Sequence, residues 1–394
     1  MAIVNRSFLP GTHALFDALF AFAQRVACSQ PVCIITELDS ARRDTLKAAF
    51  GDHDVDIMAC NPRSDSSSGL IQRGWDAAVF MAWTLFSLIK CRPAKIYVST
   101  NPPILVPFIV FIYSKLSGSK YYYHLQDIHP EATNIIVPIP IAPYRFIRWI
   151  DSITMRHAAA IITLSEAMRE CISVRSDTPA PIHLLDNPAA RIPTSLKQNR
   201  NNGFVFCGNA GRLQRIPLVI DSIKSYLDQG GALQFAFAGA GLFAPQIAQL
   251  AETYDSVTFH GAVSADEASQ LMNQHNWALM PIEDEVTCYA FPSKSSSYVL
   301  AGCKIIAICG RETSLGQWVE AHGLGYVLRP DKKEIIGFFR KVEAGHITQQ
   351  TSNRGRDDLK HMLTIEHFVN QLHKIMGLDR ASGCRGRLRQ VSPS

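Results

Sequence analysis

The chain contains 394 residues, of which 47% are hydrophobic and 19% charged, and its formal net charge is +5. This length exceeds what one hydrophobic core usually serves, so we expect two domains, and the composition excludes a largely disordered protein. Part of the positive charge lies in residues 379–394, so the remainder is nearly neutral, which argues against a nucleic-acid-binding surface over the whole protein.

The ten cysteines are scattered singly without a CxxC pair, which is typical of reduced thiols in a cytosolic protein. The N-terminal stretch MAIVNRSFLPG has neither the basic region nor the apolar run of a signal peptide, so we expect a cytoplasmic protein. No apolar stretch reaches the ~18 residues that a membrane span needs. Residues 74–90 and 104–116 come nearest. Both are predicted as buried helices, and the alternative is that they dip into a membrane surface.

In the first half of the chain, short β-branched runs alternate with helical patterns, as in parallel sheets covered on both faces. The predicted strands are residues 2–6, 32–38, 95–100, 120–127, 159–165 and 181–187. Leu15, Leu19, Phe22 and Val26 have helical spacing and mark the first predicted helix. A polar run with two prolines over residues 188–202 then predicts a domain linker.

The alternation resumes after the linker. The predicted strands are residues 204–208, 233–239, 257–263, 277–282, 304–309 and 325–328. Residues 346–358 break the pattern, and residues 359–376 predict a last helix of about four to five turns. We therefore predict an α/β fold with two Rossmann-like domains, in which ligands bind at the carboxyl ends of strands that face each other across a cleft. The predicted parts are an N-terminal domain (1–187), the linker (188–202), a C-terminal domain (203–345), a region with the terminal helix (346–378) and a basic disordered tail (379–394).

Two strand-to-helix turns carry glycines that could expose backbone N–H groups to a ligand. In FLPGTHA, Gly11 precedes the first predicted helix, and the alternative is a simple turn. In FVFCGNAGRLQRIP, glycines and arginines follow a strand, and N–H groups with forked guanidinium groups suit diphosphate oxygens. The second turn therefore predicts a phosphate-binding loop, with solvated arginines on a plain turn as the alternative. Its residues are Gly208, Asn209, Gly211, Arg212 and Arg215.

The segment FPSKSSSYVLAG begins another predicted helix with a proline, a lysine and several serines. Pro292 suits the first helical turn. Ser293, Lys294 and Ser295 could offer amides, a hydroxyl or an ammonium group to an anion. This segment is therefore a second candidate for anion binding.

The stretch FAGAGLFA fits the dinucleotide pattern GxGxxA at Gly239, Gly241 and Ala244. Such a site also needs an acid at the end of the next strand to hold the ribose hydroxyls, and none stands there, so NAD is not predicted. The sequence also lacks a GxSxG elbow, a Walker A loop and a CxxC zinc pair, which argues against hydrolase, P-loop and zinc sites.

The densest polar cluster of the first domain is YYYHLQDIHPEA. His124, Asp127 and His129 could suggest a metal site, but strand alternation would point His124 and Asp127 to opposite faces. We expect instead a carboxylate or an imidazole at the mouth of the cleft, with capping of the next helix as the alternative. No metal is predicted.

Taken in order, several motifs resemble the retaining nucleotide-sugar glycosyltransferases of family 4, which have the GT-B fold. The motifs are STNPP, KYYYHLQDIHPEA, AAIITLSEAMRE, LDNP, FCGNAGRLQ, FAGAG, FHGAV and FPSKSSSYVLAGCKIIA. The resemblance extends over about residues 3–376 and is nearest to the bacterial branch that builds O-antigen, capsule or exopolysaccharide. It implies transfer of a hexosyl or N-acetylhexosaminyl group, usually from a UDP-sugar, to a glycan or a polyprenyl-linked acceptor.

The resemblance also implies roles for individual residues. Residues 208–215 would meet the donor diphosphate, and Pro292, Ser293 and Lys294 would meet it from the other side. Gly261 and Val263 would border the base. The acceptor would lie on the N-terminal domain near Gly11, Thr12 and Asp127, and the last helix would cross back to that domain. Asp127, His124, Arg212 and Lys294 are the catalytic candidates. No cofactor is expected, because the nucleotide-sugar is a substrate and the leaving diphosphate accepts the proton of the acceptor.

Three positions depart from the family pattern. Many members have two glutamates eight positions apart, where this chain has Tyr289 and Ser297. Ser297 would be a weaker partner for the donor ribose than a carboxylate. Gln214 stands near the place of a lysine in the phosphate-binding loop. The departures leave two alternatives open, a family member that binds sugar nucleotides without turnover and a UDP-sugar 2-epimerase of related fold.

The apolar segments have a further interpretation in this context. Residues 74–95, which end with Arg92 and Lys95, and residues 143–150, with two arginines among aromatic side chains, could form an apolar and basic lip on the acceptor domain. This pattern suggests peripheral contact with the cytoplasmic face of the inner membrane.

Overall fold

The computed structural model describes residues 1–9, 14–61, 70–189, 200–347 and 353–378. Within these, the chain divides into two compact units. Unit 1 contains Met1–Asp186 and the described residues from Ile365 on, and unit 2 contains Asn187–Thr364. No helix within the described ranges is both long and apolar enough to cross a membrane.

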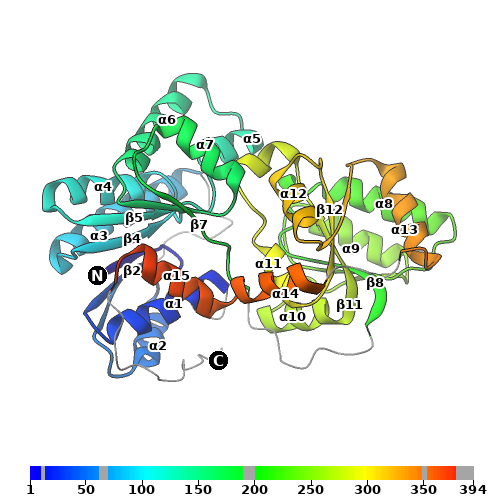
Figure 1. Cartoon of the computed structure of the whole chain (residues 1–394), viewed down its shortest axis with the longest axis horizontal. Coiled ribbons are helices and arrows are strands. Elements are labelled where there is room, and N and C mark those ends of the chain that lie inside the picture. Colours follow the sequence, from blue (N-terminus) through cyan, green and yellow to red (C-terminus); the bar gives the residue numbers. More distant parts are fainter. Residues whose placement is uncertain (10–13, 62–69, 190–199, 348–352, 379–394) are drawn as a thin grey trace. The chain divides into compact units, whose positions relative to one another are not determined.

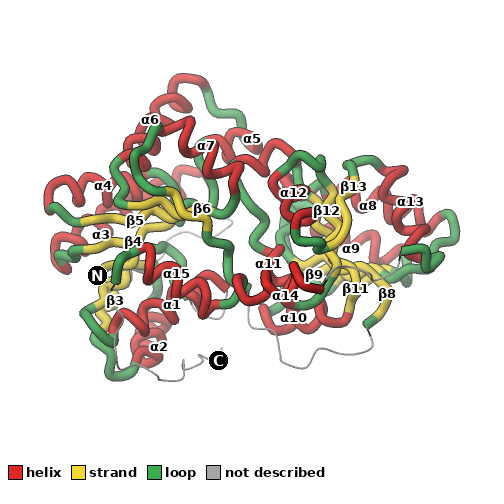
Figure 2. Tube along the Cα trace, in the orientation of Figure 1, coloured by secondary structure: helices red, strands yellow, loops and turns green. Residues whose placement is uncertain are grey.

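Unit 1 is built on a seven-stranded parallel sheet in the order β3-β2-β1-β4-β5-β6-β7 (Figure 1). The strands are β1 (Ala2–Val4), β2 (Val32–Glu37), β3 (Val55–Cys60), β4 (Lys95–Ser99), β5 (Lys120–His124), β6 (Ala160–Thr163) and β7 (Ile182–Leu184). The helices are α1 (Ala14–Ala27), α2 (Ser40–Phe50), α3 (Leu70–Cys91), α4 (Leu105–Ser117), α5 (Glu131–Ile136), α6 (Ile141–Arg156), α7 (Glu166–Ser176) and α15 (Ile365–Ile375). Figure 2 shows the strands lying between layers of helices.

The central strands of this sheet are buried because helices cover both of its faces. The residues of β1 and nearly all of those of β2 are buried, which matches their continuous apolar runs. Helix α15 packs against α1 in the same core, with Phe368 and Leu372 among the buried side chains. The terminal helix therefore belongs to the N-terminal unit, as predicted.

Unit 2 is built on a six-stranded parallel sheet in the order β10-β9-β8-β11-β12-β13. The strands are β8 (Asn201–Cys207), β9 (Phe235–Ala238), β10 (Val257–Phe259), β11 (His275–Pro281), β12 (Lys304–Ile308) and β13 (Gly325–Leu328). The helices are η1 (Arg212–Gln214), α8 (Ile216–Asp228), α9 (Ala244–Thr253), α10 (Ala265–Gln274), η2 (Asp284–Cys288), α11 (Lys294–Leu300), α12 (Ser314–Ala321), α13 (Lys332–Glu343) and α14 (Asn353–Met362). Aromatic rings, among them Phe204, Phe235 and Trp277, fill its core.

The prediction of two Rossmann-like α/β domains is confirmed, but β3 was not predicted. Its sequence VDIMAC carries an aspartate, and Asp56 is exposed because β3 is an edge strand. An acid in a short run weakens the pattern of a buried strand, although it is tolerated at the edge of a sheet.

The single terminal helix predicted over residues 359–376 is wrong, because α14 ends at Met362 and α15 begins at Ile365. Leu363 is fully buried, and its carbonyl oxygen accepts a hydrogen bond from the backbone N–H of Ala189. The Thr364 hydroxyl donates to the carbonyl oxygen of His361. The contact with Ala189 is tertiary and that of Thr364 is local. Both occupy backbone carbonyl groups that a continuous helix would use, and apolar periodicity does not reveal them. The predicted disordered tail (379–394) lies outside the described residues, as does most of the predicted linker, and β8 already begins at Asn201.

Candidate functional site

The loops at the carboxyl end of the unit 2 sheet are joined by backbone hydrogen bonds. The N–H of Gly208, after β8, donates to the carbonyl oxygen of Ala238 at 2.9 Å, and the N–H of Ala210 donates to Ala240 at 2.7 Å. The N–H of Gly239, after β9, donates to the carbonyl oxygen of Gly261 at 2.6 Å. We call residues 208–215, 239–243 and 260–263 the loop cluster. Parallel sheets bind ligands at this end of their strands.

Glycines allow the loop cluster to pack closely. Gly208 and Gly239 have φ angles of 138° and 135°, which other residues rarely adopt. A Cβ atom on Gly239 would overlap the carbonyl oxygen of Gly208. The glycine pattern that resembles a dinucleotide fingerprint therefore serves, in this chain, to bring the loops after β8 and β9 together.

Lys294 is the first residue of α11, and its ammonium group lies against the loop cluster. Nζ lies 3.9 Å from the centre of the Phe206 ring and 3.4 Å from the point where a Cβ of Gly208 would stand. This atom is buried and has no hydrogen-bond partner among the described residues. Burial lowers the pKa of Lys294 to about 7. Within the described part of the chain, Nζ of Lys294 is therefore buried without a carboxylate in hydrogen-bonding distance.

The two arginines of the predicted phosphate-binding loop differ in what they contact. Arg212 is exposed on η1. The Arg215 side chain is only 14% exposed, and its guanidinium lies 3.0 Å from Glu283 and 3.1 Å from Asp284. Asp284 also accepts a hydrogen bond from the Gly310 N–H at 3.0 Å. Arg215 therefore ties the loop after β8 to those after β11 and β12, so its guanidinium is already occupied by carboxylates.

The remaining residues of this loop are placed by local contacts. Asn209 is exposed and Gly211 is half-buried. The Gly211 N–H donates to Oε1 of Gln214 at 3.0 Å, so the Gln214 side chain stabilises the turn in which it lies. Val263 and Gly261 are half-buried at the end of the loop cluster.

The serines that follow Lys294 have separate environments. Ser295 and Ser296 are each 2% exposed, and the Ser296 hydroxyl donates to the carbonyl oxygen of Asn187 at 2.6 Å. Ser293 is exposed, whereas Pro292 and Ser297 are half-buried. Of the hydroxyls in FPSKSSSY, those of Ser293 and Ser297 thus remain nearest to the surface.

Tyr298 anchors this helix in the core of unit 2. Its hydroxyl is fully buried and accepts a hydrogen bond from the Cys207 N–H at 2.9 Å. Cys207 is the last residue of β8, directly before Gly208. The contact fixes α11, and with it Lys294, relative to the start of the loop cluster.

In unit 1, the expectation that His124 offers an imidazole at the mouth of a cleft is wrong. His124 ends β5 and is fully buried. Nδ1 lies 2.6 Å from the Tyr97 hydroxyl, and Nε2 lies 2.6 Å from the side-chain nitrogen of Gln126. Burial lowers its pKa to about 3, so the ring is neutral near pH 7. Both faces of the sheet are covered, so the end of this strand does not bring His124 to solvent.

Asp127 and His129 lie in the loop after β5, and both are half-buried. Burial raises the pKa of Asp127 to about 6. Nδ1 of His129 lies 2.8 Å from the Thr133 hydroxyl, and burial lowers its pKa to about 4. Of the polar cluster in YYYHLQDIHPEA, Asp127 remains the one catalytic candidate with a carboxylate at this end of the sheet. Gly11 and Thr12, the acceptor-side candidates, lie outside the described residues.

A buried ion-pair network, which the sequence did not reveal, links α5, α6 and α7. Arg175 of α7 lies 2.8 Å from Glu131 and 2.7 Å from Asp151 of α6, and all three side chains are buried. The Tyr123 hydroxyl donates to Asp151 at 2.8 Å. Glu131 of α5 therefore forms ion pairs with Arg148 of α6 and Arg175 of α7, which are distant from it in the sequence.

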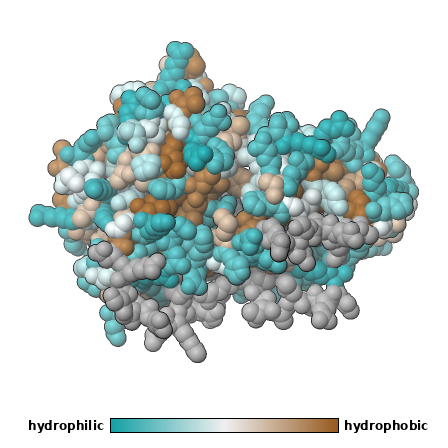
Figure 3. All heavy atoms as spheres, in the orientation of Figure 1, coloured by the Kyte–Doolittle hydropathy of each residue, from teal (hydrophilic) through white to brown (hydrophobic). Residues whose placement is uncertain are grey.

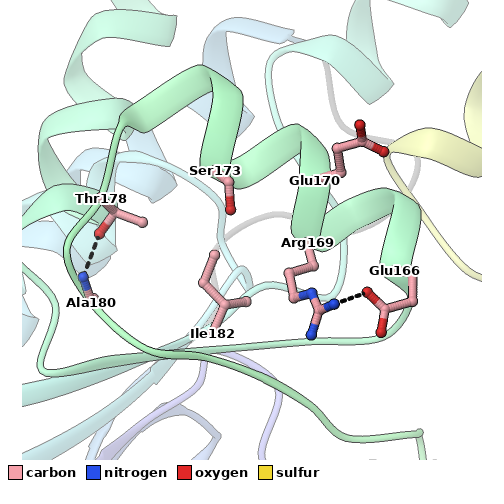
Figure 4. A pocket seen from close by; sticks show the side chains of 7 residues that line it. All are labelled: Glu166, Arg169, Glu170, Ser173, Thr178, Ala180 and Ile182. Atoms are coloured by element: carbon pink, nitrogen blue, oxygen red, sulfur yellow. Dashed lines mark hydrogen bonds and ion pairs between the residues drawn. The ribbon is translucent and has the colours of Figure 1, made fainter.

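Unit 1 also has a surface pocket of 610 Å³ beside the edge strand β7 (Figure 4). Its lining includes Glu166 and Arg169, which form an ion pair at 2.5 Å, and Ile182 of β7. None of the predicted site residues lines it.

The comparisons with known proteins agree on the fold. The chain is 24% identical over 294 residues to the "Probable glycosyltransferase WbjE" of Pseudomonas aeruginosa, covering 68% of this chain and 71% of the relative. The crystal structure of Anabaena HepE in complex with UDP matches with a TM-score of 0.63 at 16% identity and covers 95% of this chain and 99% of its own. This chain has the GT-B fold.

A further solved structure supports that assignment. WaaG, described as a glycosyltransferase involved in lipopolysaccharide biosynthesis, matches with a TM-score of 0.61 at 12% identity and covers 97% of this chain and 100% of its own. No family model matches the chain. WbjE and WaaG are thus named as glycosyltransferases, and the likeness of this chain to the solved structures shows its fold.

Proposed function

We propose that this GT-B protein is a retaining glycosyltransferase of family 4 in bacterial surface polysaccharide biosynthesis. It transfers a hexosyl or N-acetylhexosaminyl group from a UDP-sugar to a glycan or a polyprenyl-linked acceptor. The observation that carries the proposal is the buried ammonium of Lys294, which lies against the glycine loop after β8 and has no hydrogen-bond partner in the described ranges. HepE, which is similar over nearly the whole chain, was solved with UDP.

The chemistry of a diphosphate fits the loop cluster. A buried ammonium without an anion costs several kcal/mol, and a phosphate oxygen would offset that cost. Exposed Arg212 can approach the diphosphate from solvent, and because Gly208 has no Cβ atom, a phosphate oxygen can come close to the backbone there. Negative charge grows on the leaving diphosphate during transfer, so these groups stabilise the transition state more than the ground state. This route requires neither a metal nor a cofactor.

For the acceptor side, we propose peripheral contact with an anionic membrane through α3, α4 and α6. Helix α4 packs against both of the others. Their exposed apolar side chains are Trp75, Phe86, Ile89, Leu105, Leu116, Ile141, Phe146 and Trp149. Among the described side chains of these helices, both acids, Asp76 and Asp151, are buried, and every exposed charge is basic. Figure 3 shows apolar patches that reach the surface among hydrophilic residues.

Vesicle co-sedimentation tests the membrane contact. Wild-type protein should sediment with vesicles that contain phosphatidylglycerol and stay in solution with pure phosphatidylcholine vesicles. Replacement of Phe146 and Trp149, which stack on α6, by serine should reduce the sedimented fraction several-fold. Equal sedimentation of wild type and variant would contradict the contact.

Incubation of the purified protein with a panel of UDP-sugars tests the transferase itself, with the products separated by chromatography. Slow donor hydrolysis, or transfer to a glycan or lipid-linked acceptor, supports the proposal. The 2-epimer of the donor would support the epimerase, for which Asp127 is the remaining carboxylate candidate. Donor binding without turnover would support a non-catalytic protein, an alternative motivated by Tyr289 and Ser297. The anomeric configuration of a transferred sugar reports whether the reaction retains it.

A further inference from the structure

Asp76 of α3 is a buried carboxylate that the proposed donor site does not use. Its side chain is 2% exposed, and neither of its oxygens has a hydrogen-bond partner among the described residues. Burial of an ionised carboxylate without a partner costs several kcal/mol. Such a group in a folded protein calls for an explanation, for example a ligand that supplies the missing hydrogen bonds.

The position of Asp76 in α3 places it near the carboxyl end of the unit 1 sheet. Asp76, Phe80 and Thr84 are four residues apart and all buried, so they form one stripe on the helix. The helix packs against β1, β2 and β3. Because α3 leads from the end of β3 back to the start of β4, its first turns lie toward the carboxyl ends of the strands. Ligands of parallel sheets bind at that end.

Glu37 and Arg6 lie at the carboxyl ends of two of the three strands that α3 packs against. Glu37 is the last residue of β2, and Arg6 follows β1. Nε of Arg6 donates to Glu37 at 2.7 Å. Burial raises the pKa of Glu37, the hydrogen bond and charge of Arg6 oppose the rise, and the charge of Asp76 adds to it. Asp76 is therefore close enough to Glu37 to interact with it, and the Arg6 cation is bonded to Glu37.

We propose that Asp76, beside the Arg6–Glu37 pair, binds hydroxyl groups of the acceptor sugar at the carboxyl end of the unit 1 sheet. This inference rests on the proposed function. An ionised carboxylate only accepts hydrogen bonds, so its ligand must donate them. Two neighbouring hydroxyls of a pyranose offer one donor to each free oxygen. A phosphate is a poor ligand here, because two carboxylates would repel it.

A site of this kind would select the acceptor. A buried group that is built to bond a substrate hydroxyl rejects analogues that lack it, because the group is then left unpaired. Asp76 is thus a specificity-determining residue on the unit that does not carry Lys294.

Saturation-transfer NMR with octyl glycosides of glucose, galactose, mannose and N-acetylglucosamine tests the site on the full-length protein. The variants are Asp76→Asn and, as a control on the exposed edge of the same sheet, Asp56→Asn. At least one glycoside should bind the wild type and the control alike. Its signal should fall at least fivefold in Asp76→Asn, and this variant should melt at the same or a higher temperature than wild type, because a buried unpaired charge is removed.

Three results would overturn the site: no glycoside binding to wild type, equal binding to Asp76→Asn, or a melting temperature of Asp76→Asn clearly below that of wild type. The last result would show that the carboxylate has a structural partner. UDP titration of the same samples separates this proposal from the proposed function. If UDP binds and the glycosides do not, only the Asp76 site is wrong, whereas absence of UDP binding to wild type contradicts the donor site.

Discussion

The two sheets share a strand order, but the buried ionisable groups that have atoms without a hydrogen-bond partner differ in charge between the units. In unit 2, among the described residues, the main such group is the ammonium of Lys294, which lies against Gly208. In unit 1, again among the described residues, it is the carboxylate of Asp76, and Glu37, bonded to Arg6, and Asp127 also follow strands of that sheet. A cationic site suits a diphosphate, and a carboxylate site suits hydroxyl donors. The difference indicates that the binding chemistry of each unit comes from a few loop and helix residues and not from the shared fold.

The largest expected effect is the pH dependence of donor binding. With a pKa of about 7, Lys294 is mostly protonated below pH 7 and mostly neutral above it in the free protein. A bound diphosphate favours the ammonium form, so binding above pH 7 requires uptake of a proton. Affinity for a UDP-sugar should therefore be constant below pH 7 and fall up to about tenfold per pH unit above it.

Titration calorimetry from pH 6 to pH 9 measures this dependence, and Lys294→Arg serves as the control. An arginine stays protonated over this range, so any remaining affinity of that variant should not depend on pH. A flat profile for wild type would contradict the assignment of the cation site to Lys294.

His124→Phe should lower the stability of unit 1 and leave the affinity for the donor unchanged. The variant leaves the Tyr97 hydroxyl and the Gln126 side chain without their partner, so we expect a loss of about 2 kcal/mol in the free energy of unfolding. Denaturant unfolding measures the loss, and UDP titration provides the control. A variant as stable as wild type would show that these hydrogen bonds carry little energy.

Ser297→Glu should have a smaller effect, on the donor side. A carboxylate accepts a stronger hydrogen bond from a ribose hydroxyl than a serine does, so UDP affinity should increase by about 1 kcal/mol. The matched variant Ser297→Gln, which has the same length without the charge, should gain less. Weaker UDP binding of Ser297→Glu would indicate that the ribose does not lie at this position.

The fold was largely predictable, because strand and helix periodicities are local properties of the chain. The turn at Gly208 was also visible because it directly follows a strand pattern, and Lys294 was visible because it follows Pro292 at the start of a helical pattern. What the sequence did not reveal depends on tertiary contacts. His124 lies in a polar stretch, yet the sheet buries it between Tyr97 and Gln126. Arg215 was a candidate for diphosphate binding, but its carboxylate partners come from a loop about seventy residues later in the chain.

Asp76 was missed for a related reason. Asp76 is the one acid in the apolar segment over residues 74–90. The interpretation of that segment used its length and its apolar periodicity, and neither draws attention to a single acid. A single acid within an apolar helix is a usable signal, because it is costly to bury unless it has a purpose. The signal becomes specific only once the structure shows that Asp76 faces the sheet and has no partner among the described residues.

Titration of UDP into wild-type protein and into Lys294→Ala tests whether unit 2 binds a nucleoside diphosphate at the loop cluster. Arg169→Ala, on the surface of unit 1, is the charge-matched control. UDP should bind wild type and the control equally, and Lys294→Ala should lose about 1 to 3 kcal/mol of binding free energy. Equal UDP affinity of Lys294→Ala and wild type would contradict binding at this cluster.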